Sequence, residues 1–533
     1  MSKKRIFTIR SVEPFSPSLS SVKNNENSST IDKESKTTNF VKNPWKVFKH
    51  WITESFNYYC ETTSLHGFNY ITREGITFGE RVFWIGVVVL AIIASIVLVS
   101  VSWSSNRETP TVTVIEGSHF PTWNVPFPAV TICNFNKISK QKALLLANKM
   151  IRPDNISDEE IAQLFRITMY YSFALNYNET DFKRLEDILK FNNYTSNRLF
   201  DELTPNCIDM IVRCIWKGTN ARCDSLFQKI NTTEGICCSF NYFGMATNNF
   251  PVKLSYQVPK IPFRVTGCGY PTGLTILLNP EMDDYFGTYV SSYGFRLMIH
   301  DAYDFPDENA DMKVLTSSRE SFVRIVPEST YATPSVAEMP IQQRNCLFAN
   351  EKKLRVMQRY SYINCLMECR VSMIFKACGC IPINLPNNGS YPVCKFDEYV
   401  CIINNRDILI KAIPSLENTI IRGTSRMASN CDCLPDCELN QYPSDITMGK
   451  LHTKFAANNI AGIVNMDPNE SILLHVFFSD LMSTRYRTDI YQNWLSMLAS
   501  FGGLLGLIMG FSIVTAFEFL YYLTFRPIFN FFK

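Results

Sequence analysis

The sequence predicts an α+β membrane protein in which two transmembrane helices flank a large, disulfide-rich extracellular domain. Two apolar segments, residues 82–105 and residues 490–525, are each long enough to cross a bilayer. All of the 18 cysteines except Cys60 lie between these segments. Such crowding is typical of a domain that folds in an oxidising compartment. The 533 residues, 46% of them hydrophobic, suffice for one large or two medium domains.

The first apolar segment contains no charged residue between positions 82 and 105. A helix of this length would measure about 36 Å, which is enough to span a bilayer. The segment is too long and too far from the first residue for a cleaved signal peptide. We therefore expect an uncleaved signal anchor.

Basic residues predict that both ends of the chain lie in the cytoplasm, because Lys and Arg are enriched on the cytoplasmic side of membrane spans. They are Lys42, Lys46, Lys49, Arg73 and Arg81 before the first span, and Arg526 and Lys533 after the second. Arg485 and Arg487, on the other flank, weaken this bias only slightly. We expect a multi-pass plasma-membrane protein with cytoplasmic regions 1–81 and 526–533 and an extracellular domain at 106–489.

The residue pattern between the spans predicts both strands and helices. Short apolar runs rich in β-branched residues predict strands at 127–133, 274–278 and 472–478. Amphipathic runs predict surface helices at 157–175 and 180–191. The first of these opens with Ser-Asp-Glu-Glu, which is a favourable capping sequence for a helix start.

The segment between the spans also carries signals of extracellular processing. Glycosylation sequons occur at Asn155, Asn178, Asn193, Asn231, Asn388 and Asn469. Cysteines spaced as Cys-Gly-Cys and Cys-Asp-Cys resemble metal ligands, but an extracellular setting favours disulfides over zinc. The odd number of cysteines leaves at least one free or paired between chains. We expect no bound metal and no cofactor.

The second apolar segment is unusual for a simple anchor. It contains glycines at 502, 503, 506 and 510, and glycines four apart allow close approach between helices. It also contains one charge, Glu518, and a carboxylate at this depth usually faces a polar interior or a water path. These features predict a helix that lines a pore.

Composition argues against two other classes of protein. The net charge of +3 is too small to suggest a nucleic-acid-binding protein. The sequence contains no nucleophile–base arrangement and no phosphate-binding loop that stands out from chance, so we do not expect an enzyme.

Several short motifs occur in a fixed order along the chain. They are Leu65-His66-Gly67-Phe68 before the first span, Phe127-Pro-Ala-Val-Thr-Ile-Cys133-Asn134 after it, Arg344-Asn345-Cys346-Leu347, Thr484-Arg485-Tyr486 ahead of the second span, and Ser500-Phe501-Gly502-Gly503 through Gly510-Phe511-Ser512 within it. In this order they resemble the degenerin and epithelial sodium channel family, which includes the acid-sensing channels. The sequence looks most like insect pickpocket channels.

The resemblance implies a trimeric, sodium-selective, amiloride-type channel. Each subunit would have palm, knuckle, finger, thumb and β-ball regions. Gly510, Phe511 and Ser512 match the family's selectivity filter, where the second helix is interrupted and backbone oxygens can line the narrowest part. Glu518 matches the pore carboxylate that attracts cations, and sodium is the permeant ion.

The resemblance also assigns residues that control gating. Ala499 matches the degenerin position, where a larger side chain holds family channels open. His66 and Gly67 match a re-entrant cytosolic loop near the lower pore. A lone alanine or histidine would otherwise be read as structural.

By the same resemblance we expect six disulfides. They are Cys133–Cys268, Cys346–Cys437, Cys365–Cys433, Cys369–Cys431, Cys378–Cys401 and Cys380–Cys394. The family gives no assignment for Cys207, Cys214, Cys223, Cys237 and Cys238. The sequence shows no recognisable acidic pocket, which argues against gating by protons.

Three alternatives to a homotrimeric channel stay open at this point. An ATP-gated trimeric channel and a two-span receptor or adhesion protein share the two spans and the cysteine-rich loop. A regulatory subunit that conducts only in a heterotrimer with related channel subunits is compatible with every motif. The stimulus, an extracellular ligand or a tether, is not indicated by the sequence.

Overall fold

The computed structural model describes residues 53–54, 56–151, 156–245, 261–410, 431–452, 467, 469–526 and 529. They form two compact units. The larger unit is Ile96–Phe501, and the smaller unit combines Met1–Ser95 with Gly502–Lys533. The boundaries fall within two long apolar helices, α3 (Phe78–Glu108) and α18 (Trp494–Met509).

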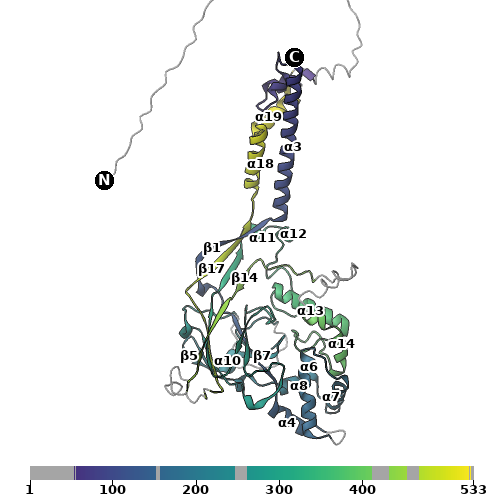
Figure 1. The fold of residues 1–533 in the computed structure, drawn as a ribbon, viewed down its shortest axis with the longest axis vertical. Helices are drawn as coiled ribbons and strands as arrows, with labels where there is room; N and C mark the ends of the chain where they lie inside the picture. Colours follow the sequence, from purple (N-terminus) through teal and green to yellow (C-terminus); the bar gives the residue numbers. More distant parts are fainter. Residues whose placement is uncertain are drawn as a thin grey trace, which may run out of the picture. The chain divides into compact units, whose positions relative to one another are not determined.

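One helix among the described residues, α3, is by itself long and apolar enough to cross a membrane. Only Val88 and Ser95 are buried along its length, so nearly all of its apolar side chains face outward in the single chain. The second apolar segment is broken into α18 and α19 (Ile513–Leu520), which are bent by 69° and count as one span if taken together. Figure 1 labels the two halves separately.

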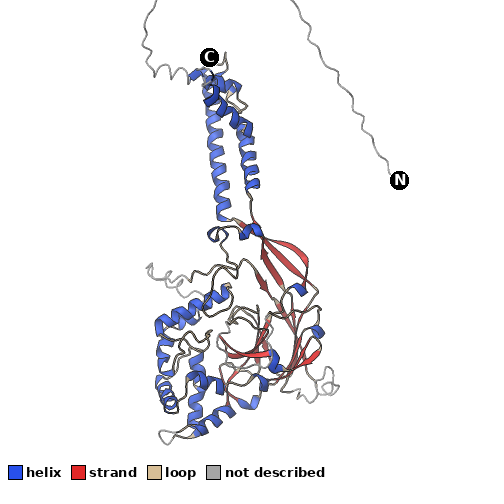
Figure 2. Cartoon of the chain, turned by 180° about the vertical axis from the view of Figure 1, so that it is seen from behind, coloured by secondary structure: helices blue, strands red, loops and turns tan. Residues whose placement is uncertain are grey.

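The larger unit consists of four β-sheets and a set of helices. The five-stranded sheet has the order β11-β10-β2-β7-β6 and the six-stranded sheet the order β15-β12-β16-β8-β4-β5; a four-stranded sheet, β1-β17-β13-β14, and the pair β3-β9 complete the set. In Figure 2 the strands of this unit lie together, and most of its helices line one side of them.

The strands have the following bounds: β1 Thr111–Pro121, β2 Ala129–Asn134, β3 Asn136–Ser139, β4 Ile211–Trp216, β5 Thr219–Ala221, β6 Phe227–Thr232, β7 Gly235–Phe240, β8 Leu274–Leu278, β9 Tyr285–Thr288, β10 Phe295–His300, β11 Asp311–Leu315, β12 Arg319–Ile325, β13 Glu328–Ala332, β14 Leu439–Gln441, β15 Ser444–Lys450, β16 Ile472–Phe478 and β17 Met482–Ile490. Most neighbours are antiparallel, whereas β12 runs parallel to β16 and β13 parallel to β17.

The remaining described helices are α2 Asn69–Thr72, α4 Lys140–Lys149, α5 Asp158–Arg166, α6 Thr168–Ser172, α7 Glu179–Phe191, α8 Ser196–Leu203, α9 Cys207–Met210, α10 Cys223–Leu226, α11 Pro334–Ala337, α12 Ile341–Arg344, α13 Tyr362–Cys378, α14 Tyr399–Asn404 and α15 Arg406–Ile410. The predicted strands correspond to β2, β8 and β16. The predicted helix at 157–175 is divided into α5 and α6, and the one at 180–191 is α7.

Local signals account for these helix starts. Ser157 caps α5, accepting a hydrogen bond from the Glu160 N–H while the Glu160 carboxylate accepts one from the Ser157 N–H. This reciprocal capping was predicted from the Ser-Asp-Glu-Glu sequence. Strands β2 and β16 are buried along their whole length. Sheet strands buried on both faces read as continuous apolar runs, which is why both were visible in the sequence.

Eight disulfides are formed, and five of them are the pairs expected around the long helix α13. These are Cys346–Cys437, Cys365–Cys433, Cys369–Cys431, Cys378–Cys401 and Cys380–Cys394. Cys365 and Cys369 lie one turn apart on α13, so one face of the helix can receive two bonds from the short segment around Asp432. The other three disulfides are Cys133–Cys237, Cys207–Cys238 and Cys214–Cys223.

The expected pair Cys133–Cys268 is wrong. Strand β2 pairs antiparallel with β7 in a register that sets Ile132 opposite Cys238. This register brings Cys133 beside Cys237, with 4.6 Å between their Cα atoms. Two cysteines of the described chain are unpaired, the exposed Cys268 and the buried Cys60. The register of a sheet depends on long-range pairing, so cysteine spacing could not reveal it.

The pairing predicts which thiol is reactive. On intact cells, a membrane-impermeant maleimide should label the wild-type chain at Cys268, because every other cysteine between the spans is in a disulfide. A Cys268→Ser variant should lose this label and keep its cell-surface level, and peptide mapping should still find Cys133 oxidised. Reduced Cys133 in the variant would show instead that Cys133 pairs with Cys268.

Candidate functional site

The break in the second apolar segment is made by two adjacent helix-end signals. Gly510 adopts a left-handed backbone conformation with φ of 69°, which L side chains rarely adopt. Its N–H donates to the Gly506 carbonyl and the Phe511 N–H donates to the Leu505 carbonyl, at 2.9 and 3.3 Å. The bond from Gly510 to Gly506, made by a residue in the left-handed conformation, is an αL cap and ends α18.

A new helix then begins at once. Ser512 is extended and caps α19: its hydroxyl accepts from the Thr515 N–H, and its own N–H donates to the Thr515 hydroxyl, at 3.2 and 3.3 Å. The peptide groups between α18 and α19 are therefore outside both helices. In a membrane, such irregular backbone is tolerated only where it is covered by protein or lines water.

A segment from before the first span packs against this break, and both belong to the smaller unit. The His66 N–H donates to the Met509 carbonyl at 2.9 Å. The His66 ring lies so close to Gly510 that an added Cβ there would be 2.9 Å from the ring. Gly67 follows with φ of 86°, and a Cβ on it would be 2.9 Å from a methyl of Val88. The structure thus brings together the predicted residues His66, Gly67 and Gly510.

Aromatic side chains hold the same segment against α19. Tyr59 is buried and makes edge contacts with Phe519 and Tyr522, at centroid distances of 5.7 and 5.9 Å. On the other side, Tyr70 stacks on Trp84 of α3 at 4.3 Å. The segment is therefore attached at several points that do not depend on His66.

Glu518 lies on α19, within reach of the segment before the first span. Its Oε2 accepts a hydrogen bond from the Ser64 hydroxyl at 3.3 Å, and the same hydroxyl lies 3.1 Å from the Thr515 hydroxyl. Ser64 was not singled out from the sequence. Its only signal was its position two residues before His66.

The other predicted pore and gating residues have no such partner among the described contacts. Phe511 is 37% exposed and makes no ring contact within the described chain. Ala499 belongs to α18 in the larger unit and is exposed in the single chain.

A second candidate site is a cavity of about 740 Å³ within the larger unit. It lies where the end of β10 and the following loop meet the start of α13 and the strand β14. Six of its lining residues are carboxylic acids, against one arginine, Arg359. The acids are Asp301, Asp304, Asp307, Asp311, Asp436 and Glu438. No acidic pocket was recognisable in the sequence, whereas the tertiary fold assembles this one.

The environment of the cavity favours protonated carboxyl groups. Burial raises the pKa of Asp436 to about 6, although the Tyr362 N–H donates to its carboxylate at 3.1 Å. Burial also raises the pKa of Asp301 and that of Asp304, and the charge of Asp301 raises the latter further. In the sequence, the run Asp-Ala-Tyr-Asp-Phe-Pro-Asp at 301–307 was the available signal, but its residues meet Asp436 only through the tertiary fold.

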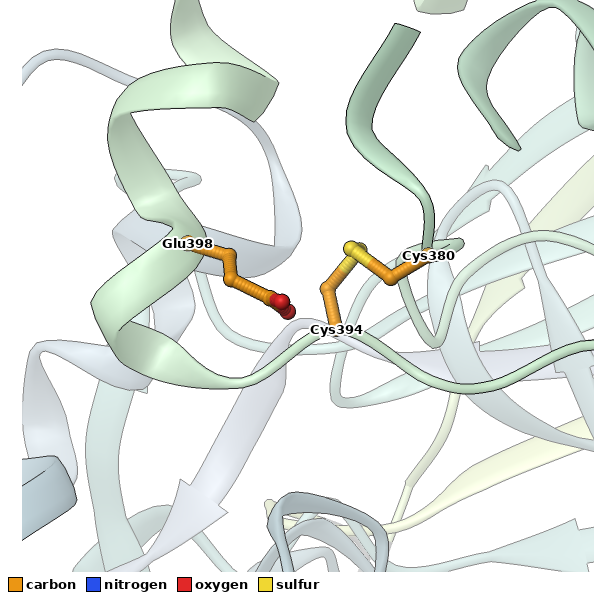
Figure 3. A group of neighbouring side chains, drawn as sticks. All are labelled: Cys380, Cys394 and Glu398. Atoms are coloured by element: carbon orange, nitrogen blue, oxygen red, sulfur yellow. A yellow bond between two sulfur atoms is a disulfide. The ribbon is translucent and has the colours of Figure 1, made fainter. Parts of the chain in front are cut away.

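Cys380, Cys394 and Glu398 form the one cluster of metal-ligand residue types found among the described residues. Figure 3 shows the two sulfur atoms bonded to each other, with the carboxylate beside them. Disulfide sulfurs are not thiolates and do not coordinate zinc. Glu398 instead accepts a hydrogen bond from the Lys395 N–H at 2.7 Å, so the cluster is structural.

The sequons occupy different environments. Asn178, Asn193 and Asn469 are exposed, whereas Asn231 and Asn388 are half-buried. The side-chain amide of Asn388 donates to the Arg355 carbonyl at 3.1 Å. Asn155 lies outside the described residues.

Comparison with known proteins gives matches over nearly the whole chain. The family model described as amiloride-sensitive sodium channel matches residues 59–522, a range that contains α3, α18 and α19. In Drosophila melanogaster, the sodium channel protein Nach is 27% identical over 489 residues, which cover 89% of this chain and 88% of Nach. Pickpocket protein 11 of the same species is 28% identical over 478 residues, covering 89% and 77%. The bile acid-sensitive ion channel of Mus musculus is 24% identical over 491 residues, covering 87% and 86%.

The break predicts a strong effect of Gly510→Ala. The left-handed conformation costs an L residue about 1–2 kcal/mol, and the new methyl group would meet the His66 ring. We expect cation current per surface-expressed chain to fall by at least about tenfold, the effect of 1.4 kcal/mol in an equilibrium.

Gly86→Ala in α3 is the matched control, because nothing lies within 4 Å of a Cβ at that position. Gly86→Ala should keep wild-type current. Equal currents from the two variants would contradict the role of the break.

The cavity predicts a pH-dependent stability. Because the pKa of Asp436 is raised in the folded state, its protonated form is favoured there. Protonated Asp436 therefore adds to the free energy of unfolding. This stabilisation is fully present below the pKa of Asp436 in the unfolded chain, about 4, and is lost as the pH rises through about 6. Asp436→Asn should raise the unfolding temperature at pH 7.4 and reduce its change between pH 7.4 and pH 5.

Asp187→Asn on α7 is the control for this measurement, because Asp187 is exposed. It should follow the wild-type pH profile. An Asp436→Asn profile parallel to wild type would show that Asp436 is ionised throughout this range.

Proposed function

Because this chain belongs to the amiloride-sensitive sodium channel family, we propose that it forms a trimeric, sodium-selective pore lined by its second apolar segment. Membership makes it a membrane ion channel subunit and not an enzyme. The carrying observation is the break at Gly510–Ser512, where peptide groups outside both helices, the Ser512 hydroxyl and the carboxylate of Glu518 follow one another along one segment. Backbone and hydroxyl oxygens can replace part of the hydration shell of sodium, and three carboxylates would concentrate cations.

In this proposal His66 and Gly67 belong to a re-entrant loop that supports the filter from the cytoplasmic side. Both termini are cytoplasmic and residues 106–489 are extracellular. Asn155, Asn178, Asn193, Asn231, Asn388 and Asn469 are candidates for glycosylation. Small Ala499 allows three second spans to close together. The partners are two further copies or related subunits, and the surrounding lipid bilayer.

The acidic cavity favours extracellular protons or small cations as the stimulus. Asp436 would change charge near pH 6, and the ionised carboxylates of the cavity would also attract a cation. An anionic ligand, as the name of the murine relative indicates for that protein, would meet like charge here. We therefore place the sensing of an acid or cationic stimulus at this cavity.

The test of the pore is current from this chain expressed alone in oocytes, as wild type and as Ala499→Val. Added bulk at position 499 should hold the pore open and give a steady sodium current that amiloride blocks. The current should vanish when external sodium is replaced by an impermeant cation. Leu498→Val, its neighbour on α18, should behave as wild type.

Silence of Ala499→Val despite normal surface expression would overturn the homomeric pore. It would support the alternative of a regulatory subunit, and co-expression with related subunits would then have to restore the current. The receptor and ATP-gated alternatives are disfavoured by the family match, and ATP should evoke no current.

A further inference from the structure

A chain of hydroxyl groups joins the filter to the pore carboxylate. The Ser512 hydroxyl lies 3.0 Å from that of Thr515, which lies 3.1 Å from that of Ser64. Ser64 in turn donates to Oε2 of Glu518 at 3.3 Å. All four residues belong to the smaller unit, but Ser64 comes from the opposite end of the sequence.

The geometry points to Ser64 as a positioning residue for sodium selectivity, holding the filter hydroxyl of Ser512 and the carboxylate of Glu518 in one hydrogen-bonded array. This inference rests on the proposed function and adds to it a residue outside both spans. Ser64 itself need not touch the permeant ion.

The direction of the hydrogen bonds follows from chemistry. An ionised carboxylate only accepts, so the single hydrogen of Ser64 is directed at Glu518. The Ser64 oxygen then accepts from Thr515, and the Thr515 oxygen accepts from Ser512. Each hydroxyl therefore donates toward the charge, and such chains strengthen cooperatively.

This direction matters for the filter. The hydrogen of Ser512 is committed to Thr515, and one lone pair of its oxygen accepts from the Thr515 N–H. The remaining lone pair of the Ser512 oxygen is free to face a cation. Without Ser64, the Thr515 hydroxyl would lose its acceptor and could turn its hydrogen toward Ser512, which would leave Ser512 free to rotate.

The exposure of these side chains is consistent with a hydroxyl array that has one end in water. Thr515 is fully buried, which protects the middle of the array. Ser64 and His66 are exposed in the single chain, and Glu518 is half-buried. Exposed polar groups at membrane depth face a water path or other protein and not lipid, so this side of the smaller unit is suited to the pore axis.

Ser64 is not needed simply to attach its segment. The His66 N–H bond to Met509 and the contacts of Tyr59 with Phe519 and Tyr522 hold that segment independently. Removing one hydroxyl should therefore leave the pore assembled and change its ion preference.

The test is the permeability ratio of sodium to potassium, from reversal potentials of the full chain carrying Ala499→Val. Adding Ser64→Ala should lower this ratio by about threefold or more, which is within the effect expected from the loss of one hydrogen bond. Ser64→Thr, which keeps the hydroxyl, should retain the parent ratio. Thr62→Ala is the matched control, since the Thr62 hydroxyl bonds only within its own helical turn, to Tyr58 and Tyr59 carbonyls.

A double-mutant cycle separates positioning from a general structural effect. If Ser64 acts through Glu518, then Ser64→Ala should change the ratio much less in a Glu518→Gln background than in the parent. An unchanged ratio in Ser64→Ala, or effects that simply add, would overturn the inference.

A measurement without current keeps the inference separate from the proposed pore. In membranes from cells expressing the full chain, a Ser64→Cys/Thr515→Cys pair should form a disulfide on mild oxidation, detected as a linked peptide, while a Thr62→Cys/Thr515→Cys pair should not. Absence of the first link overturns the inference whatever the current. A link in a chain that carries no current supports the hydroxyl array and counts against the homomeric pore.

Discussion

The termination of one helix at Gly510 and the start of another at Ser512 is the constraint on which the smaller unit depends. A continuous helix would have satisfied every peptide group internally and given a plain apolar anchor. The left-handed glycine removes that option, and the serine cap restarts the helix in a new direction, bent by 69°. The peptide groups between them need support from elsewhere, and the segment around His66 supplies it.

Because the segment around His66 packs against the break, glycines are required where the two regions are in contact. Gly510 must lack a side chain both for its φ and because the His66 ring occupies the space beside it. Gly67 must lack one because Val88 is in contact with it. Gly510 therefore resists substitution for two independent reasons, one conformational and one steric. A glycine of α18 such as Gly503 should tolerate a side chain far better, because a Cβ there would have no atom within 4 Å.

In the larger unit, disulfides reinforce the apolar core that packs around α13. Five bonds tie this helix and its flanking segments, and several close long loops, such as the 91-residue separation of Cys346 and Cys437. Closing loops of this size limits the unfolded chain more than it changes the folded one. The covalent framework can thereby hold six acidic residues around one cavity. Burial raises the pKa of four of them, Asp301, Asp304, Asp307 and Asp436, so keeping these four ionised at neutral pH opposes folding.

The sequence by itself determined the features that depend on neighbouring residues. These features are the uncharged first span, the largely apolar strands β2 and β16, and the Ser157 cap. The break at Gly510 and Ser512 is also local, but it was expected from the resemblance to the family. The motif order was sufficient to identify the family, and with it the five disulfides around α13. Only the tertiary structure decided the partner of Cys133, because that partner depends on the register between β2 and β7. It alone also decided the acidic cavity and the contact between Ser64 and Glu518, since these groups are far apart in the sequence and meet only through folding.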